Sequence, residues 1–128
     1  MQNLALAMLG GAAGSGLRWL LATAYAARGL DRLPWATFSA NFVGSLLIGV
    51  LARLAADPVR LGEPLRVLLI VGVLGGFTTY SSFNEEVLRL LRDGAATKAI
   101  GYVAATMIAC LAAGALGHWL AGLAARGA

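Results

Sequence analysis

Four long stretches of the chain contain no Asp, Glu, Lys or Arg, and they constrain the fold more than any other feature. They comprise residues 1–17, 33–52, 67–84 and 99–125. A transmembrane helix needs about 20 predominantly apolar residues. Of the 128 residues, 59% are hydrophobic and 12% are charged, too few charges to cover the apolar area in water. The sequence therefore predicts an all-α membrane protein and excludes a large extramembrane enzyme.

The expected spans cover approximately residues 3–27, 34–54, 65–92 and 97–124. They form a single four-helix transmembrane domain over residues 1–128, with both termini on the same side. The first span continues past Arg18, because the next turn signal is Arg28-Gly29. Arg18 is then either a functional charge inside a membrane helix or a side chain that reaches the interface.

Basic residues are dispersed between the apolar runs, as in membrane anchoring, so no nucleic-acid partner is expected. One side carries five of them and the other four: Arg28, Arg32, Arg89, Arg92 and Lys98, against Arg53, Arg60, Arg66 and Arg126. This near balance gives little instruction for orientation. It predicts insertion in both directions and makes an antiparallel homodimer possible.

The third span has an unusual centre, residues 75–83 (GGFTTYSSF). Paired glycines followed by hydroxyl residues loosen a helix, which predicts a break at mid-depth. Released carbonyl oxygens at this depth would suit a small monovalent cation. The alternative is a glycine kink whose hydroxyls bond back to the helix. Glycines in the other spans predict close helix packing.

Polar side chains also mark the second and fourth spans. Thr37, Asn41 and Ser45 share one face of the second span, and Tyr102 and Thr106 form a similar pair in the fourth. Asn41 is either an interhelical contact or a ligand-binding amide. Such donors without carboxylates favour an anion or a neutral solute over an organic cation.

The two acidic residues that open the amphipathic end of the third span, Glu85 and Glu86, line an aqueous vestibule or face water. No nucleophile and base stand at a recognisable spacing, and no phosphate-binding loop is present. An enzyme is not expected.

Three motifs resemble the CrcB/Fluc family of fluoride channels along nearly the whole chain. The first span has GGAAG at 10–14 followed by Arg18-Trp19, and the second has TFSANFVGS at 37–45, similar to Thr-x-x-x-Asn-x-x-Gly. Residues 75–83 match the pattern Gly-Gly-x-Thr-Thr-Phe-Ser-Thr-Phe except at Tyr80 and Ser82. Tyr80 adds a hydroxyl where the family has a bare ring edge.

The resemblance implies passive export of fluoride through a dual-topology homodimer in a lipid bilayer, the bacterial inner membrane. It implies a structural sodium ion (Na+) on the two-fold axis, held by the main-chain carbonyls of Gly75 and Thr78. It also implies an anion pathway that contains Asn41, Tyr80, Phe83, Ser81, Ser82, Thr106 and Thr37. Ring edges, amides and hydroxyls can replace part of an anion's water without trapping it.

Two other functions remain open at this stage. A small proton-coupled multidrug exporter also uses about four helices in dual topology, but it needs a carboxylate in the first helix. Residues 1–27 contain no Asp or Glu. A non-transporting assembly subunit would need only the glycine-rich faces.

Overall fold

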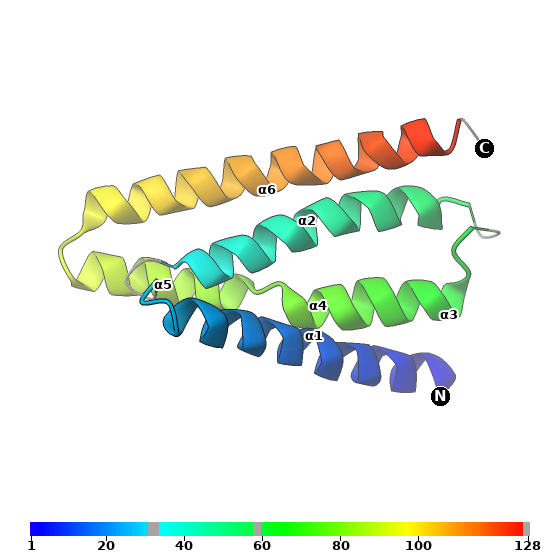
Figure 1. Ribbon diagram of the computed structural model, residues 1–128, viewed down its shortest axis with the longest axis horizontal. Coiled ribbons are helices and arrows are strands. Elements are labelled where there is room, and N and C mark those ends of the chain that lie inside the picture. The colour runs from blue at the N-terminus through cyan, green and yellow to red at the C-terminus, as the bar shows by residue number, and fades with distance from the viewer. Residues whose placement is uncertain (31–33, 58–59, 127–128) are drawn as a thin grey trace.

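The chain forms a bundle of membrane-length helices in a computed structural model that describes residues 1–30, 34–57 and 60–126 (Figure 1). Four stretches are long and apolar enough to cross a membrane: Gln2–Ala26, Trp35–Ala55, Glu63–Arg92 and Ala96–Ala124. The prediction of an all-α protein with four membrane-capable helices is confirmed. The expected span ends lie within two residues of these helix ends.

The first, second and fourth stretches are the single helices α1 (Gln2–Ala26), α2 (Trp35–Ala55) and α6 (Ala96–Ala124). Helices α2 and α6 run in the same direction, opposite to α1, and both ends of the chain lie at one end of the bundle (Figure 1). Arg32, which the orientation count included, lies outside the described residues.

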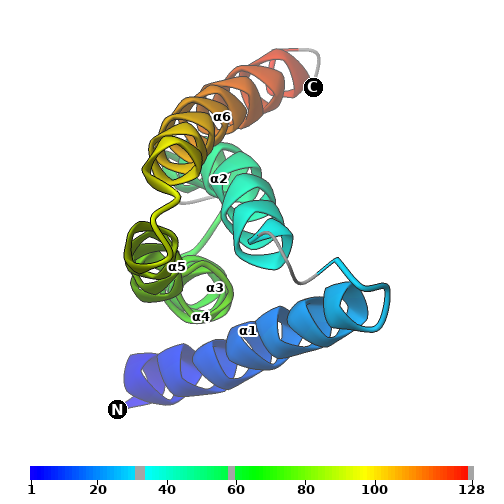
Figure 2. The same ribbon diagram turned by 90° about the vertical axis from the view of Figure 1, so that its left-hand side faces the viewer.

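Glycines bring the helices into close contact in two layers. Helix α2 packs along α6, where a methyl group on Gly49 would overlap the backbone carbonyl of Gly114. Helix α1 packs against the third stretch, where a Cβ on Gly72 would lie 2.8 Å from the Cα of Gly10. These approaches match the close packing expected of small residues in membrane helices. Figure 2 shows α1 below the third stretch and α6 on the opposite side of the bundle.

The third stretch contains four elements in succession. They are α3 (Glu63–Arg66), the π-helix η1 (Val67–Leu74), α4 (Gly75–Phe77) and α5 (Tyr80–Arg92). Between α4 and α5, Thr78 (φ −79°, ψ 154°) and Thr79 (φ −153°, ψ 116°) have extended backbone. The sequence predicted a break within residues 75–83. Gly75 and Gly76 are helical, and the extended residues Thr78 and Thr79 come directly after Phe77.

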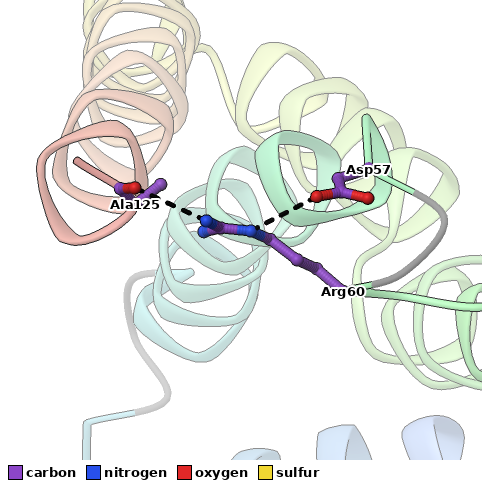
Figure 3. Close-up of polar contacts among 3 residues, drawn as sticks. All are labelled: Asp57, Arg60 and Ala125. Atoms are coloured by element: carbon purple, nitrogen blue, oxygen red, sulfur yellow. Dashed lines mark hydrogen bonds and ion pairs between the residues drawn. The ribbon is translucent and has the colours of Figure 1, made fainter. Parts of the chain in front are cut away.

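A polar contact ties the second connection to the last helix. The Arg60 guanidinium lies 3.4 Å from the Asp57 carboxylate and donates a 3.4 Å hydrogen bond to the carbonyl of Ala125 (Figure 3). Ala125 follows the C-terminal end of α6, where the helix dipole favours a positive charge. Arg60 therefore holds the connection from α2 to α3 against the end of α6.

Candidate functional site

Asn41 binds both main-chain groups of Thr79, one of the two extended residues. The Thr79 N–H donates to Asn41 Oδ1 at 2.8 Å, and Asn41 Nδ2 donates to the Thr79 carbonyl at 3.2 Å. A continuous helix would satisfy these groups internally, and groups left unpaired in hydrocarbon cost several kcal/mol each. The amide of α2 thus replaces helical hydrogen bonds at the interruption, and Asn41 is an interhelical contact with a specific purpose.

Arg18 connects the two sides of the same interruption. Its Nε donates to the Gly76 carbonyl in α4 at 3.2 Å, and one terminal nitrogen donates to the Ser82 hydroxyl in α5 at 3.4 Å. Thr79 Oγ1 accepts a 3.2 Å hydrogen bond from the Ser82 N–H and caps α5. The Arg18 side chain is therefore turned inward, to the interrupted helix.

An uncharged cavity of about 680 Å³ opens beside the interruption. Its lining includes six of the predicted site residues: Asn41, Gly75, Thr78, Tyr80, Phe83 and Thr106. Ile70, Leu74 and Met107 supply apolar surface. The described residues that line it include no Asp, Glu, Lys or Arg, so a small ion in this cavity would meet polar groups without net charge, aromatic rings and apolar side chains.

Thr106 is the buried polar group of this cavity that lacks a partner. The residue is 6% exposed, and its hydroxyl oxygen forms no hydrogen bond with the described residues that meets the usual distance and angle limits. The Tyr102 side chain lies close enough to interact with this hydroxyl. Buried hydroxyls in native proteins are nearly always hydrogen-bonded to protein, water or a ligand. The Thr106 hydroxyl is therefore available to a small species in the cavity.

A second cavity of about 490 Å³ lies on the other side of the first turn of α5. It contains the remaining predicted side chains, Thr37, Ser81 and Ser82, together with Arg18, Glu85 and Glu86. The two cavities are linked by hydroxyls, since Thr79 Oγ1 lies 3.1 Å from the hydroxyls of both Ser81 and Ser82. The structure thus divides the predicted site residues between two cavities on either side of Thr79.

Glu86 joins residues from three helices. The Thr37 hydroxyl donates to one of its carboxylate oxygens at 2.6 Å and the Tyr102 hydroxyl donates to the other at 2.8 Å. The Tyr102 ring is 5.1 Å from that of Phe83, which is 5.8 Å from that of Tyr80. A row of three aromatic rings therefore runs from the uncharged cavity to the Glu86 cluster.

The sequence did not predict the contacts of Thr79. For Glu86 it left two interpretations open, a residue that lines an aqueous vestibule or one that faces water. The partners of Glu86 lie 49 and 16 residues away, so no local spacing reveals them. The sequence did contain one signal for the hydrogen bond between the Thr79 side chain and the Ser82 N–H. Thr79 directly precedes the amphipathic segment, and threonine is a common N-cap residue that binds the N–H three residues further on.

The fold and this site define a class: small multi-pass membrane proteins whose polar groups gather at an interrupted helix. The family model described as "CrcB-like protein, Camphor Resistance (CrcB)" matches residues 5–118. The chain belongs to this CrcB family.

Three curated bacterial relatives carry the name "Fluoride-specific ion channel FluC". The relative from Phocaeicola vulgatus is 36% identical over 120 residues, 94% of this chain and 98% of its own. That from Sorangium cellulosum is 42% identical over 109 residues (85% and 86%), and that from Opitutus terrae is 45% identical over 112 residues (86% and 85%). These names denote ion channels, which are not enzymes.

Proposed function

We propose that this protein is a fluoride-selective channel of the bacterial inner membrane that exports fluoride passively. The observation that carries the proposal is the uncharged cavity, which brings together the Asn41 amide, the Thr106 hydroxyl and the aromatic rings of Tyr80 and Phe83. These groups offer donors and positive ring edges without a fixed positive charge that would hold an anion too tightly. The names of the relatives supply the identity of the anion.

The second cavity extends the proposed anion pathway toward water. Ser81, Ser82 and Thr37 offer hydroxyls there, and Arg18 offers the positive charge. Glu86 accepts two hydrogen bonds from protein hydroxyls, so its carboxylate oxygens are engaged with protein groups. The Thr79 hydroxyl lies between the two sets of groups.

The working unit of this proposal is an antiparallel homodimer. The cavity is open at the surface of the single chain, where Tyr80 is 78% exposed beside apolar residues such as Leu111. Covering this surface with a second, inverted copy would enclose the cavity and bury the Tyr80 ring. The near balance of basic residues supports insertion in both orientations.

The main-chain carbonyls of Gly75 and Thr78 fit a structural sodium ion. A continuous helix would give the Gly75 carbonyl the Thr79 N–H, but that N–H donates to Asn41. The ψ angle of Thr78 turns its carbonyl out of the helical direction, and both residues line the cavity. Two copies would offer four such oxygens, which are hard ligands suited to Na+. The bound ion would supply positive charge at the dimer axis.

Fluoride efflux from liposomes, followed with a fluoride-selective electrode, tests the function. The purified protein should release fluoride down its concentration gradient without any proton gradient. Release that requires a proton gradient, or transport of an organic cation in place of fluoride, would point to the multidrug-exporter alternative. Empty liposomes and liposomes that contain an unrelated four-helix membrane protein give the background.

A further inference from the structure

A groove of about 320 Å³, separate from both cavities of the proposed pathway, lies between α2, α5 and α6. Its walls are apolar apart from one charged residue, and they include Trp35, Phe38, Leu90, Lys98, Gly101 and Ala105. The rings of Trp35 and Phe38 meet edge to face at 6.2 Å and form one wall. The Tyr102 hydroxyl is directed to Glu86, so this residue contributes its ring to the groove.

The groove exists because α6 has small residues where it faces α2. Gly101 and Ala105 are one helical turn apart, and a Cβ on Gly101 would meet nothing within 4 Å. The space is thus a slot that the protein's own side chains leave unfilled. Because the walls of the groove are apolar and Trp35 is 46% exposed, a hydrocarbon chain suits the groove better than water does.

Lys98 supplies the charge of the groove. Ion pairs in residues 1–30, 34–57 and 60–126 engage Arg60, Arg66 and Arg92, and Lys98 is in none of them. Three acidic residues stand on the neighbouring part of the chain: Glu85, which pairs with Arg92, Glu86, which accepts hydrogen bonds from Thr37 and Tyr102, and Asp93. None of the three forms an ion pair with Lys98. Lys98 therefore presents to the groove an ammonium group that is paired with none of the described carboxylates.

The groove lies at the end of two membrane spans, where the boundary between hydrocarbon and headgroups is expected. Trp35 begins α2 and Lys98 lies in the first turn of α6, and both helices start at the same end of the bundle (Figure 1). Tryptophan and lysine at the ends of membrane spans take the headgroup level. An ammonium group above an apolar slot at this depth complements a negatively charged headgroup joined to an acyl chain.

We propose that this groove is a binding site for an anionic phospholipid. One acyl chain lies in the slot against Trp35, Phe38 and Gly101, and the headgroup phosphate binds the Lys98 ammonium. In an antiparallel dimer the two copies of the site would face opposite leaflets. The site itself does not depend on the transported ion.

Trp35 provides a built-in reporter for the test. The variant in which Trp19 and Trp119 are replaced by Phe leaves Trp35 as the sole tryptophan. It is reconstituted in phosphatidylcholine bilayers that contain a small fraction of phosphatidylglycerol with brominated acyl chains, or brominated phosphatidylcholine at the same fraction. Bromine quenches tryptophan fluorescence on contact. We expect the apparent affinity for the brominated phosphatidylglycerol to be about fivefold higher, the effect of one basic residue at the surface.

Three further variants separate the two parts of the site. Lys98→Gln should abolish the preference for phosphatidylglycerol, whereas Lys98→Arg should keep it. Gly101→Leu, whose side chain enters open space, should reduce quenching by both brominated lipids. Arg126→Gln removes a positive charge at the other end of the bundle and should change nothing.

The proposal is overturned by equal quenching from the two lipids, or by a preference that survives Lys98→Gln. It is also overturned if neither lipid quenches Trp35, which would mean that a second copy of the chain or another protein segment covers the groove. Lys98 is exposed, so Lys98→Gln is expected to fold and keeps the test decisive even if Gly101→Leu does not.

Discussion

At the scale of single residues, the polar side chains of Asn41 and Thr106 differ in their hydrogen bonding. Asn41 uses its amide on both main-chain groups of Thr79. The Thr106 hydroxyl is buried without a hydrogen bond of good geometry to the described residues. Asn41 therefore stabilises the structure and also lines the proposed pathway. The Thr106 hydroxyl makes no hydrogen bond with the described residues that would stabilise the fold.

Replacing Asn41 by Asp should abolish fluoride efflux, because the carboxylate loses both amide donors and adds negative charge to the pathway. Asp keeps an acceptor for the Thr79 N–H but sets a negative oxygen against the Thr79 carbonyl. The lost hydrogen bond should also lower the free energy of unfolding by about 1–3 kcal/mol. Efflux from liposomes and thermal unfolding measure the two effects. Undiminished efflux from an intact dimer would remove Asn41 from the pathway.

Replacing Thr106 by Val should separate transport from stability. Val has nearly the same shape but no hydroxyl, so fluoride efflux should fall. The free energy of unfolding should stay the same or rise by up to about 1 kcal/mol, because a buried unsatisfied group is removed. The matched control is Thr23→Val on α1, whose hydroxyl bonds back to the Trp19 carbonyl. A Thr106→Val protein with normal efflux would contradict a pathway role.

At the scale of elements, the interrupted third stretch is stable because its neighbours supply what a continuous helix would. Arg18 of α1 binds Gly76 before the interruption and Ser82 after it, and Asn41 of α2 binds Thr79 between them. These contacts come from two other helices, α1 and α2, so the shape of this stretch depends on the packed bundle. Gly72 and Gly76 face α1, whereas Gly75 faces the cavity.

Replacing Gly75 by Val should disrupt the proposed dimer and its proposed cation site while the single chain still folds. Gly75 has φ −61°, and a Cβ there would meet only the Ile70 carbonyl of the preceding element η1, at 3.8 Å. The added side chain therefore projects to the proposed dimer face. Sodium dependence of dimer formation, measured by analytical ultracentrifugation in detergent, should be lost.

Gly16→Val on α1 is the control for this prediction, since it also enters open space but lies away from the cavity. It has a similar cost in helix propensity. Thr78→Ser should be mild, because the proposed ligand is a main-chain oxygen and the serine hydroxyl can still donate to the Leu74 carbonyl. A Gly75→Val dimer with unchanged sodium dependence would contradict the proposed cation site.

At the scale of the whole molecule, the number of spans follows from the charge-free stretches, and turn signals such as Arg28-Gly29 were needed to place the span ends. The sequence did not reveal the pairing of α2 with α6, nor the sharing of the site between two cavities. Membrane helices are apolar on most faces, so periodicity does not say which face meets which helix. Long-range partners such as Arg18 and Gly76, 58 residues apart, depend on that packing.

Adding two lysines to one terminus should bias insertion toward a single orientation. Both termini lie at one end of the bundle, where α2 ends and α3 begins (Figure 1). The added charges therefore act together with Arg53 in the last turn of α2 and Arg66 in α3. C-terminal reporter fusions measure the orientation, and fluoride efflux should fall as mixed orientations disappear. Two added glutamines are the matched control. A single orientation in the unmodified protein would rule out the antiparallel dimer.

The shared location of the two termini also limits how a single-chain form of the proposed dimer can be built. Four spans return the chain to the side on which it started (Figure 1). The last residue of one copy and the first residue of an inverted copy therefore lie on opposite faces of the bilayer. A flexible Gly/Ser linker cannot join them through hydrocarbon. A tandem fusion needs a connecting segment of about 20 apolar residues that is itself a transmembrane helix.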